Sequence, residues 1–235
     1  MMVGKGIEDI DISVPRDAYD IGKDTPTFNA YLTVVVRDSA GKVVKIHRQR
    51  SHSPTANFIG LMLPLNYFNN TGGSFTITNT GNGTFSYQPQ LNSGARGISY
   101  PNSNTSDPGY SYIAMIQVGS GTQSNPYSAY SLASPIANGS GTGQLVYGQP
   151  SIPSNITVSG SSAYFTISQT FNNQSGGTIS ITEVGIITTI SFAIAVGTSY
   201  PSTNQLLVWY DVLSSPISVP NGGSVTIYYT FTVNP

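Results

Sequence analysis

Short apolar segments alternate with turn-forming residues along most of the chain. The clearest example is the pair Ala30–Arg37 (AYLTVVVR) and Val43–Arg50 (VVKIHRQR), which flank the glycine-containing segment Asp38–Lys42. Two β-branched runs on either side of such a turn predict a β-hairpin. Apolar and charged residues are mixed on both faces of the second strand. This mixture indicates a strand at a sheet edge or at an interface.

From residue 70 onward the same rhythm predicts a series of further strands. We expect them at Ser74–Thr80, Gly83–Pro89, Tyr110–Gly119, Gly143–Gly148, Asn155–Gly160, Ser162–Phe171, Thr178–Ile187, Ile190–Val196, Gln205–Leu213 and Ser224–Val233. The intervening segments are rich in Gly, Asn, Ser and Pro, and the last strand alternates between an apolar and a hydroxylated face. These features predict an all-β fold, an antiparallel β-sandwich that we expect to be jelly-roll-like. One large sandwich and two small ones are both open.

One segment, residues 51–68, has a helical pattern. Ser53 is a candidate N-cap with Pro54 at the first helical position, and apolar residues recur at helical spacing between residues 58 and 63. We therefore predict at most one short helix. Residues 1–28 show no sustained period and are interpreted as an extended N-terminal arm or linker before a β-sandwich body at residues 29–235.

Charge is concentrated at the start of the chain. Only 8% of the 235 residues are charged, and only four charged residues, Arg96, Asp107, Glu183 and Asp211, follow residue 50. The body is therefore nearly neutral, and the net charge of the chain is −1. A protein near zero net charge tends to associate, which favours an assembly subunit.

Few residues are available for catalysis or metal binding. The chain has no cysteine, no acidic loop of the EF-hand type and no phosphate-binding glycine loop. A Ser–His–Asp triad would need His47 or His52, and neither has a suitable setting. A Glu183–Asp211 glycosidase pair is conceivable, but we favour the interpretation that each carboxylate accepts hydrogen bonds from turn amides or pairs with an arginine. We predict no enzyme, no cofactor and no metal.

Hydropathy does not predict a membrane span. The longest apolar run, residues 184–196, is shorter than the ~20 residues that a spanning helix needs. The N-terminal residues lack the apolar core of a signal peptide.

Two groups of residues are candidates for contacts with partners. The first combines the one basic cluster with acidic residues of the arm, as possible assembly contacts: Lys42, Lys45, Arg48, Arg50, Asp17, Asp20 and Asp24. Arm-to-neighbour pairing, ordinary solvated charge and, less favoured, nucleic-acid contact are the alternatives. The second group consists of tyrosines that offer stacking surfaces to a ligand: Tyr100, Tyr110, Tyr112, Tyr127 and Tyr130.

Two stretches resemble small β-rich structural proteins of tailed phages and archaeal viruses. Residues 116–148 carry a strand ending in VGSGT, then tyrosines, then LASPI; residues 179–186 (ISITEVGI) precede the ending at 206–233. The relatives often place Arg before the Asp, whereas this chain has Tyr210–Asp211. The resemblance implies a virion component at a vertex, turret, tail or adaptor position, which binds copies of itself and other virion proteins. The alternative is a receptor- or carbohydrate-binding surface module.

Overall fold

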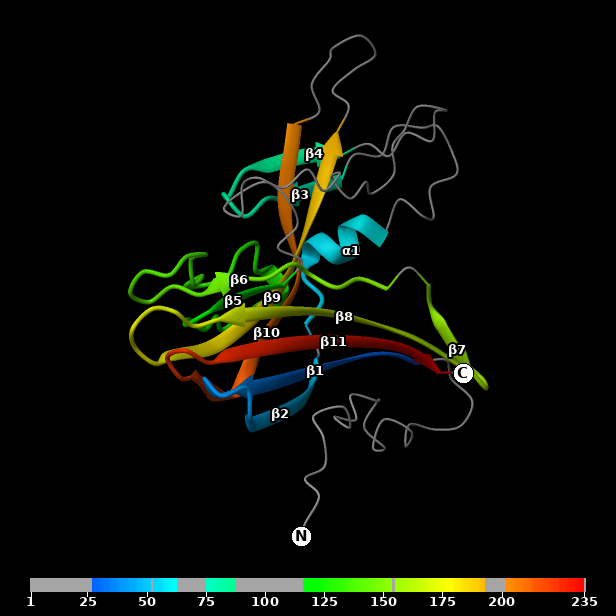
Figure 1. The fold of residues 1–235 in the computed structure, drawn as a ribbon. Helices are drawn as coiled ribbons and strands as arrows, with labels where there is room; N and C mark the ends of the chain where they lie inside the picture. The colour runs from blue at the N-terminus through cyan, green and yellow to red at the C-terminus, as the bar shows by residue number, and fades with distance from the viewer. Residues whose placement is uncertain are drawn as a thin grey trace. The chain divides into compact units, whose positions relative to one another are not determined.

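The computed structural model describes residues 27–51, 53–62, 75–87, 116–153, 155–192 and 202–234. These residues form antiparallel sheets and one short α-helix (Figure 1). The predicted all-β class with antiparallel sheets is therefore confirmed, whereas the jelly-roll arrangement stays a prediction. The chain divides into two compact units. The first holds the described residues within 1–52, 139–179 and 218–235, and the second holds those within 53–138 and 180–217.

The elements follow one another in the order β1 (Thr27–Arg37), β2 (Val43–Ser51), α1 (Ala56–Met62), β3 (Phe75–Thr78), β4 (Thr84–Tyr87), β5 (Ile116–Gly119), the 3-10 turn η4 (Pro126–Ser128), β6 (Val146–Tyr147), β7 (Thr157–Ser159), β8 (Ser162–Asn172), β9 (Ile179–Phe192), β10 (Ser202–Val219) and β11 (Ser224–Asn234).

The first unit is built on one sheet with the strand order β2-β1-β11-β8-β6, and β7 pairs with β8 as well. The predicted hairpin is present as β1 and β2. Its turn forms because Asp38 Oδ1 accepts hydrogen bonds from the N–H groups of Ala40 (3.0 Å) and Lys42 (2.9 Å). Gly41 adopts the positive φ that this turn requires. β2 is the last strand on its side among the described residues, as the mixed sequence pattern indicated.

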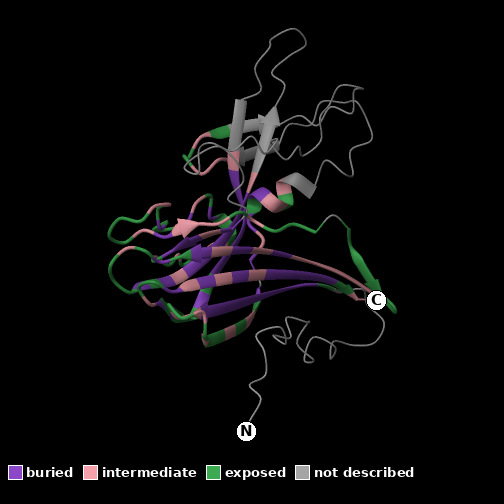
Figure 2. Ribbon diagram, viewed as in Figure 1, coloured by how far each residue is buried: buried purple, intermediate pink, exposed green. Residues whose placement is uncertain are grey.

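β11 lies between β1 and β8, and its predicted alternation explains its two faces. Val225, Ile227 and Tyr229 on the apolar face are fully buried. On the hydroxylated face, Thr226 and Thr230 form hydrogen bonds of 2.9 Å with the hydroxyls of Thr170 and Thr166 on β8. Figure 2 shows the resulting buried stretch along β1 and β11 and its exposed surroundings at β7.

The second unit contains a three-stranded sheet of order β10-β9-β5 and the hairpin β3–β4. Helix α1 adjoins this hairpin through Asn57. The Asn57 side chain accepts a hydrogen bond from the N–H of Thr78 (3.0 Å) and donates to the Thr78 carbonyl (2.7 Å). The Asn57 side-chain amide thus makes the same two hydrogen bonds to Thr78 that the backbone of a paired strand residue would make.

The predicted helix start at Ser53 and Pro54 is wrong, because α1 begins at Ala56. Ser53 to Thr55 are extended and pair with β10: the Thr55 N–H donates to the Val208 carbonyl at 3.1 Å. Pro54 fits there because it forms only an isolated bridge with Trp209.

Two further predictions on strand boundaries are wrong. The two strands expected at 178–187 and 190–196 are continuous as β9 up to Phe192, and β10 extends past the predicted Leu213 to Val219. β1 also begins at Thr27, inside the predicted arm, whose earlier residues lie outside the described part of the chain.

Candidate functional site

A buried carboxylate organises the second unit. Glu183 lies on β9 and is 0% exposed. Its Oε1 accepts hydrogen bonds from the backbone N–H groups of Gly121 (3.1 Å) and Ser134 (2.7 Å). Its Oε2 accepts from the N–H of Ala133 (2.9 Å) and from the phenol O–H of Tyr210 (2.8 Å). Four donors converge on two oxygens, an arrangement that suits an ionised carboxylate because its oxygens only accept.

Three of these donors belong to one loop, residues 120–135, which we call the anchored loop. It leaves β5 at Gly119 and returns at Pro135, which forms an isolated bridge with Gly119. Gly119 also pairs with Glu183 in the β5–β9 register. Both ends of the loop therefore lie beside the residue whose carboxylate binds them.

Two glycines are needed for the loop to approach the carboxylate. A Cβ atom on Gly119 would lie 2.3 Å from Glu183 Oε1, and one on Gly121 would lie 2.7 Å from the Cβ of Ala133. Both distances are shorter than van der Waals contact. The glycines of the VGSGT segment are thus explained by sterics, since any side chain would push the donors away from Glu183.

Tyr210 on β10 connects the carboxylate to a further part of the anchored loop. Besides donating to Glu183, its phenol oxygen accepts a hydrogen bond from the N–H of Gln123 at 3.0 Å. Burial, and next the hydrogen bond to Glu183, raise the pKa of the Tyr210 phenol well above its usual value of 10.0. The phenol therefore stays protonated and remains a donor at ordinary pH.

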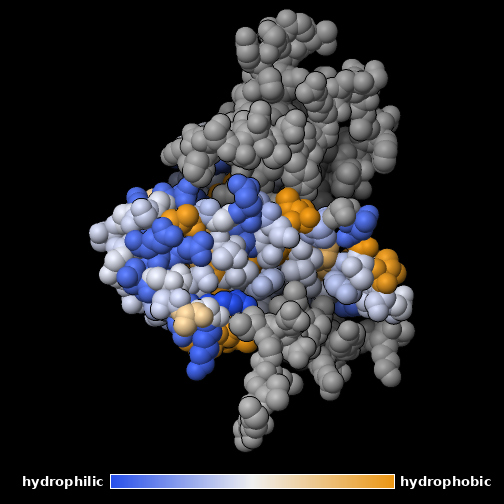
Figure 3. All heavy atoms as spheres, in the orientation of Figure 1, coloured by the Kyte–Doolittle hydropathy of each residue, from blue (hydrophilic) through white to orange (hydrophobic). Residues whose placement is uncertain are grey.

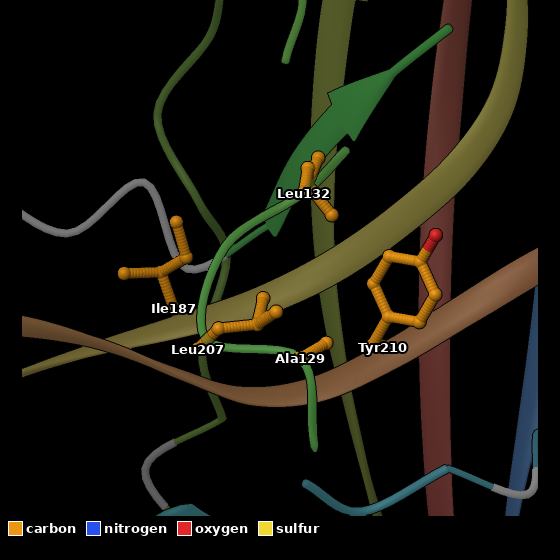
Figure 4. Close-up of a cluster of buried hydrophobic side chains, with 5 residues drawn as sticks. All are labelled: Ala129, Leu132, Ile187, Leu207 and Tyr210. Atoms are coloured by element: carbon orange, nitrogen blue, oxygen red, sulfur yellow. The ribbon is translucent and has the colours of Figure 1, made fainter. Parts of the chain in front are cut away.

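The ring of Tyr210 belongs to a small apolar cluster that supports the loop from within. Figure 4 shows its members on β10, on β9 and on the anchored loop: Ala129, Leu132, Ile187, Leu207 and Tyr210. Gly185 on β9 is required here as well, because a Cβ atom on it would lie 2.5 Å from Leu207 Cδ1. Polar and apolar contacts thus hold the same loop.

The geometry gives Glu183 a structural role. A general acid or base must reach a proton of its substrate, whereas the Glu183 oxygens are buried and bound by groups of the chain itself. This is the expected binding of a carboxylate by turn amides. Asp211, the other member of the conceivable glycosidase pair, lies on β10 and is 3% exposed.

The predicted basic cluster lies at the exposed edge of the first unit. Lys42 is in the β1–β2 turn, and Lys45, Arg48 and Arg50 are exposed on β2. Arg50 donates a hydrogen bond to Asn29 Oδ1 at 2.5 Å. The structure thus brings the four basic residues to one strand and its turn. Their predicted partners Asp17, Asp20 and Asp24 lie outside the described residues, so the pairing stays a prediction.

Only part of the predicted tyrosine group is described. Tyr127 and Tyr130 both lie on the anchored loop and are 57% and 37% exposed. Tyr100, Tyr110 and Tyr112 lie outside the described residues. The two exposed rings are therefore carried by the same loop that Glu183 holds.

Among the described residues, no three His, Cys, Asp or Glu side chains come together to hold a metal ion. His47 instead forms a 2.9 Å hydrogen bond with Gln49, and His52 lies outside the described residues. No helix in the described part of the chain has the length and hydropathy for crossing a membrane.

Sequence reasoning identified an acceptor role for Glu183 but missed its donors and missed Tyr210. The donors of Glu183 lie in the segments VGSGT and LASPI, and Glu183 itself lies in TEVG. The order of these segments in the chain does not reveal that they meet in the fold. No family model, no curated protein and no solved structure matches this chain. Its fold and site define a class in structural terms alone: an all-β protein with a loop held by an internal carboxylate.

Proposed function

We propose that this chain is a non-enzymatic structural component of a virus particle. One observation carries the proposal. Three of the segments on which the resemblance to virion proteins rests meet at Glu183, because TEVG supplies the carboxylate, and VGSGT and LASPI supply its three backbone donors. A pattern whose parts depend on one another physically is better evidence of a shared structure than a composition common to β proteins.

The site suits an assembly subunit because it fixes the shape of a surface loop. A fully satisfied buried polar network rigidifies the segment that it holds. The anchored loop is tied by four hydrogen bonds to Glu183 and Tyr210 and carries exposed side chains such as Tyr127. A rigid loop loses little conformational entropy on contact with a neighbour.

In this proposal, assembly proceeds through repeated contacts with copies of the chain and with other virion proteins. Uncharged faces exclude water at the contacts, and the basic edge of β2 pairs with the acidic arm of a neighbour to fix register. Vertex, turret, tail and adaptor positions are all compatible with this mechanism.

A second candidate function is a receptor- or carbohydrate-binding surface module. It is favoured by the exposed rings of Tyr127 and Tyr130 on a loop of fixed conformation. An aromatic ring offers a sugar an apolar face with a polar rim. The double variant Tyr127→Ala with Tyr130→Ala would abolish this binding without removing any group that holds the loop.

The test is the solution mass of the purified chain by light scattering, with negative-stain images of the same fraction. We expect a discrete assembly with closed symmetry, since most oligomers are closed. A chain that forms no regular assembly and binds no other virion protein would overturn the proposal. A specific glycan-array signal that the Tyr127 and Tyr130 double variant loses would assign the chain to the second function.

A further inference from the structure

A row of apolar side chains crosses one end of the first unit's sheet. The strand registers place Phe28 of β1 opposite Val233 of β11, Val233 opposite Ala163 of β8, and Ala163 opposite Val158 of β7. Residues opposite one another in a sheet point to the same face. These four residues, which we call the apolar row, therefore share one face across four strands.

The apolar row is exposed, although the same face is buried further along the strands. Phe28, Val233 and Val158 are 52%, 47% and 73% exposed, whereas Leu32 and Ile227, farther along β1 and β11, are fully buried. Figure 3 shows hydrophobic side chains at the end of the molecule where Figure 1 labels β7. An apolar strip spanning several strands is a feature of interaction surfaces rather than of ordinary solvated ones.

The row has a preformed aromatic support. Phe231 on β11 stacks on Phe28 with ring centroids 5.9 Å apart and on Phe165 of β8 at 5.0 Å. The side chains of the row are therefore backed by packed rings on paired strands. A partner would meet a surface that needs little rearrangement.

The strands that carry the row hold almost no charge. β7, β8 and β11 contain no Asp, Glu, Lys or Arg, and the one charged residue of β1, Arg37, lies at the opposite end of that strand from Phe28. Arg50 of β2 reaches Asn29, next to Phe28, so a described charge lies near the Phe28 end of the row. A partner with charged groups would have to desolvate them along β11, β8 and β7 without compensation. A second copy brings the same neutral surface, and at a net charge of −1 two copies hardly repel each other.

We propose that the apolar row is the contact between two copies of this chain, with Val158 and Val233 in its buried core. The inference rests on the proposed function and specifies one of its repeated contacts. In a two-fold arrangement the same patch serves both copies, so a self-complementary neutral row is sufficient. The basic edge at β2 adjoins the Phe28 end of the row, whereas Val158, at the other end, lies on β7, which pairs with β8.

The first test is the variant Val158→Asp, studied by light scattering over a dilution series. Because Val158 is 73% exposed in the single chain, the variant should fold and melt like the wild type, which circular dichroism checks. Its self-association should weaken by about 30-fold or more, the effect of disrupting an interface hot spot. Val158→Ile should retain association. The matched control is Ile59→Asp on α1, where Ile59 is 51% exposed and lies in neither proposed contact.

A second test uses thiol accessibility, since the chain has no cysteine of its own. Val158→Cys and Ile59→Cys each introduce a unique thiol. At concentrations where the chain associates, a bulky maleimide should react slowly with the thiol at position 158. Dilution should restore its reactivity, whereas the thiol at position 59 should react at one rate throughout.

Several results would overturn the inference. These are a wild-type chain that stays monomeric at every concentration, a Val158→Asp variant with wild-type association, and equal reactivity of both thiols at all dilutions. If Val158→Asp loses binding to another virion protein but keeps its self-association, the row is the contact with that protein instead. Regular assemblies that persist in Val158→Asp would reject the row and leave the proposed function standing. Copies that pair through the row but form no regular assemblies would support the row and reject the proposed function.

Discussion

The anchored loop and the apolar row differ in which groups they bury: the loop encloses a polar group, whereas the row leaves apolar groups exposed. At the loop, the carboxyl group of Glu183 is buried in the second unit and receives four hydrogen bonds from the chain itself. At the row, in the first unit, apolar side chains on uncharged strands remain in contact with water. One site is complete within a single chain, and the other is the contact that we propose between two copies.

This difference separates folding from association. A buried carboxylate surrounded by donors stabilises only if all of its partners are present, so its residues should be sensitive to substitution. An exposed apolar residue contributes little to the stability of the single chain. We therefore expect changes at Glu183 to affect unfolding and changes at Val158 to affect assembly.

The largest effect on stability should come from Glu183→Ala. Removing the carboxylate leaves the N–H groups of Gly121, Ala133 and Ser134 without their acceptor inside the protein. The free energy of unfolding should fall by about 3 kcal/mol or more, measured by urea denaturation. In the same assay Val158→Asp should change it by less than about 0.5 kcal/mol. Equal losses for the two variants would contradict the conclusion that Glu183 serves folding and Val158 serves association.

The next largest effect should come from Gly119→Ala. The added Cβ would lie 2.3 Å from Glu183 Oε1 and would force the carboxylate and the loop apart. We expect a loss of about 1–3 kcal/mol in the free energy of unfolding, the range for overpacked sites. The control is Gly177→Ala, where an added Cβ meets nothing within 4 Å and φ is not positive. A neutral Gly119→Ala would show that the loop tolerates displacement.

Tyr210→Phe should have a smaller effect because it removes one hydroxyl and keeps the ring in its cluster. Glu183 Oε2 loses one of its two donors, and the Gln123 N–H loses its acceptor. We expect a loss of about 1–2 kcal/mol in urea denaturation. If Tyr210→Phe has wild-type stability, then the loop amides alone hold the carboxylate.

The same phenol predicts a dependence on alkaline pH. Its pKa is raised in the folded protein above the unfolded value of 10.0, so its contribution to stability is fully present below pH 10. That contribution is lost as the pH rises from 10 through the folded pKa, because the unfolded chain then releases a proton that the folded chain retains. In a tyrosinate absorbance titration, the Tyr210 phenol should ionise near pH 10 in the unfolded protein and only at higher pH in the folded protein. Tyr210→Phe should therefore reduce the difference between the two titrations by one group.

The smallest effect should come from the first unit's hydroxyl pairs. Thr226→Val removes the 2.9 Å hydrogen bond to the hydroxyl of Thr170 but keeps a β-branched residue on β11. The free energy of unfolding should fall by about 0.5 kcal/mol, as for other cross-strand pairs. A loss as large as that of Glu183→Ala would mean that polar contacts matter equally in both units.

Local patterns were sufficient where pairing is local or strictly periodic. The β1–β2 hairpin follows from a β-branched run, a turn with Asp38 and Gly41, and a second run. The faces of β11 follow from its alternation, with Val225 and Ile227 buried as expected. In both cases the residues that determine the structure are close together in the sequence.

The failures arose where distant segments decide the outcome. Ser53–Pro54 is locally a good helix start, but backbone hydrogen bonds to β10, over 150 residues later, hold this segment extended. The donors of Glu183 were missed for the same reason, because Gly121 precedes it by 62 positions. Periodicity indicates what a segment can form, whereas long-range pairing selects among these forms.

The pairing of β1 with β11 has a consequence for how the first unit forms. Eleven successive residue pairs, from Thr27 opposite Asn234 to Arg37 opposite Ser224, join segments near the two limits of the described chain. Closing such a large loop costs entropy before any contact repays it, so this sheet should fold slowly. During synthesis, the Val34–Val36 run must wait for β11 before it acquires its second neighbour. In that interval the nascent chain exposes an aggregation-prone strand, and a chaperone would act on it then.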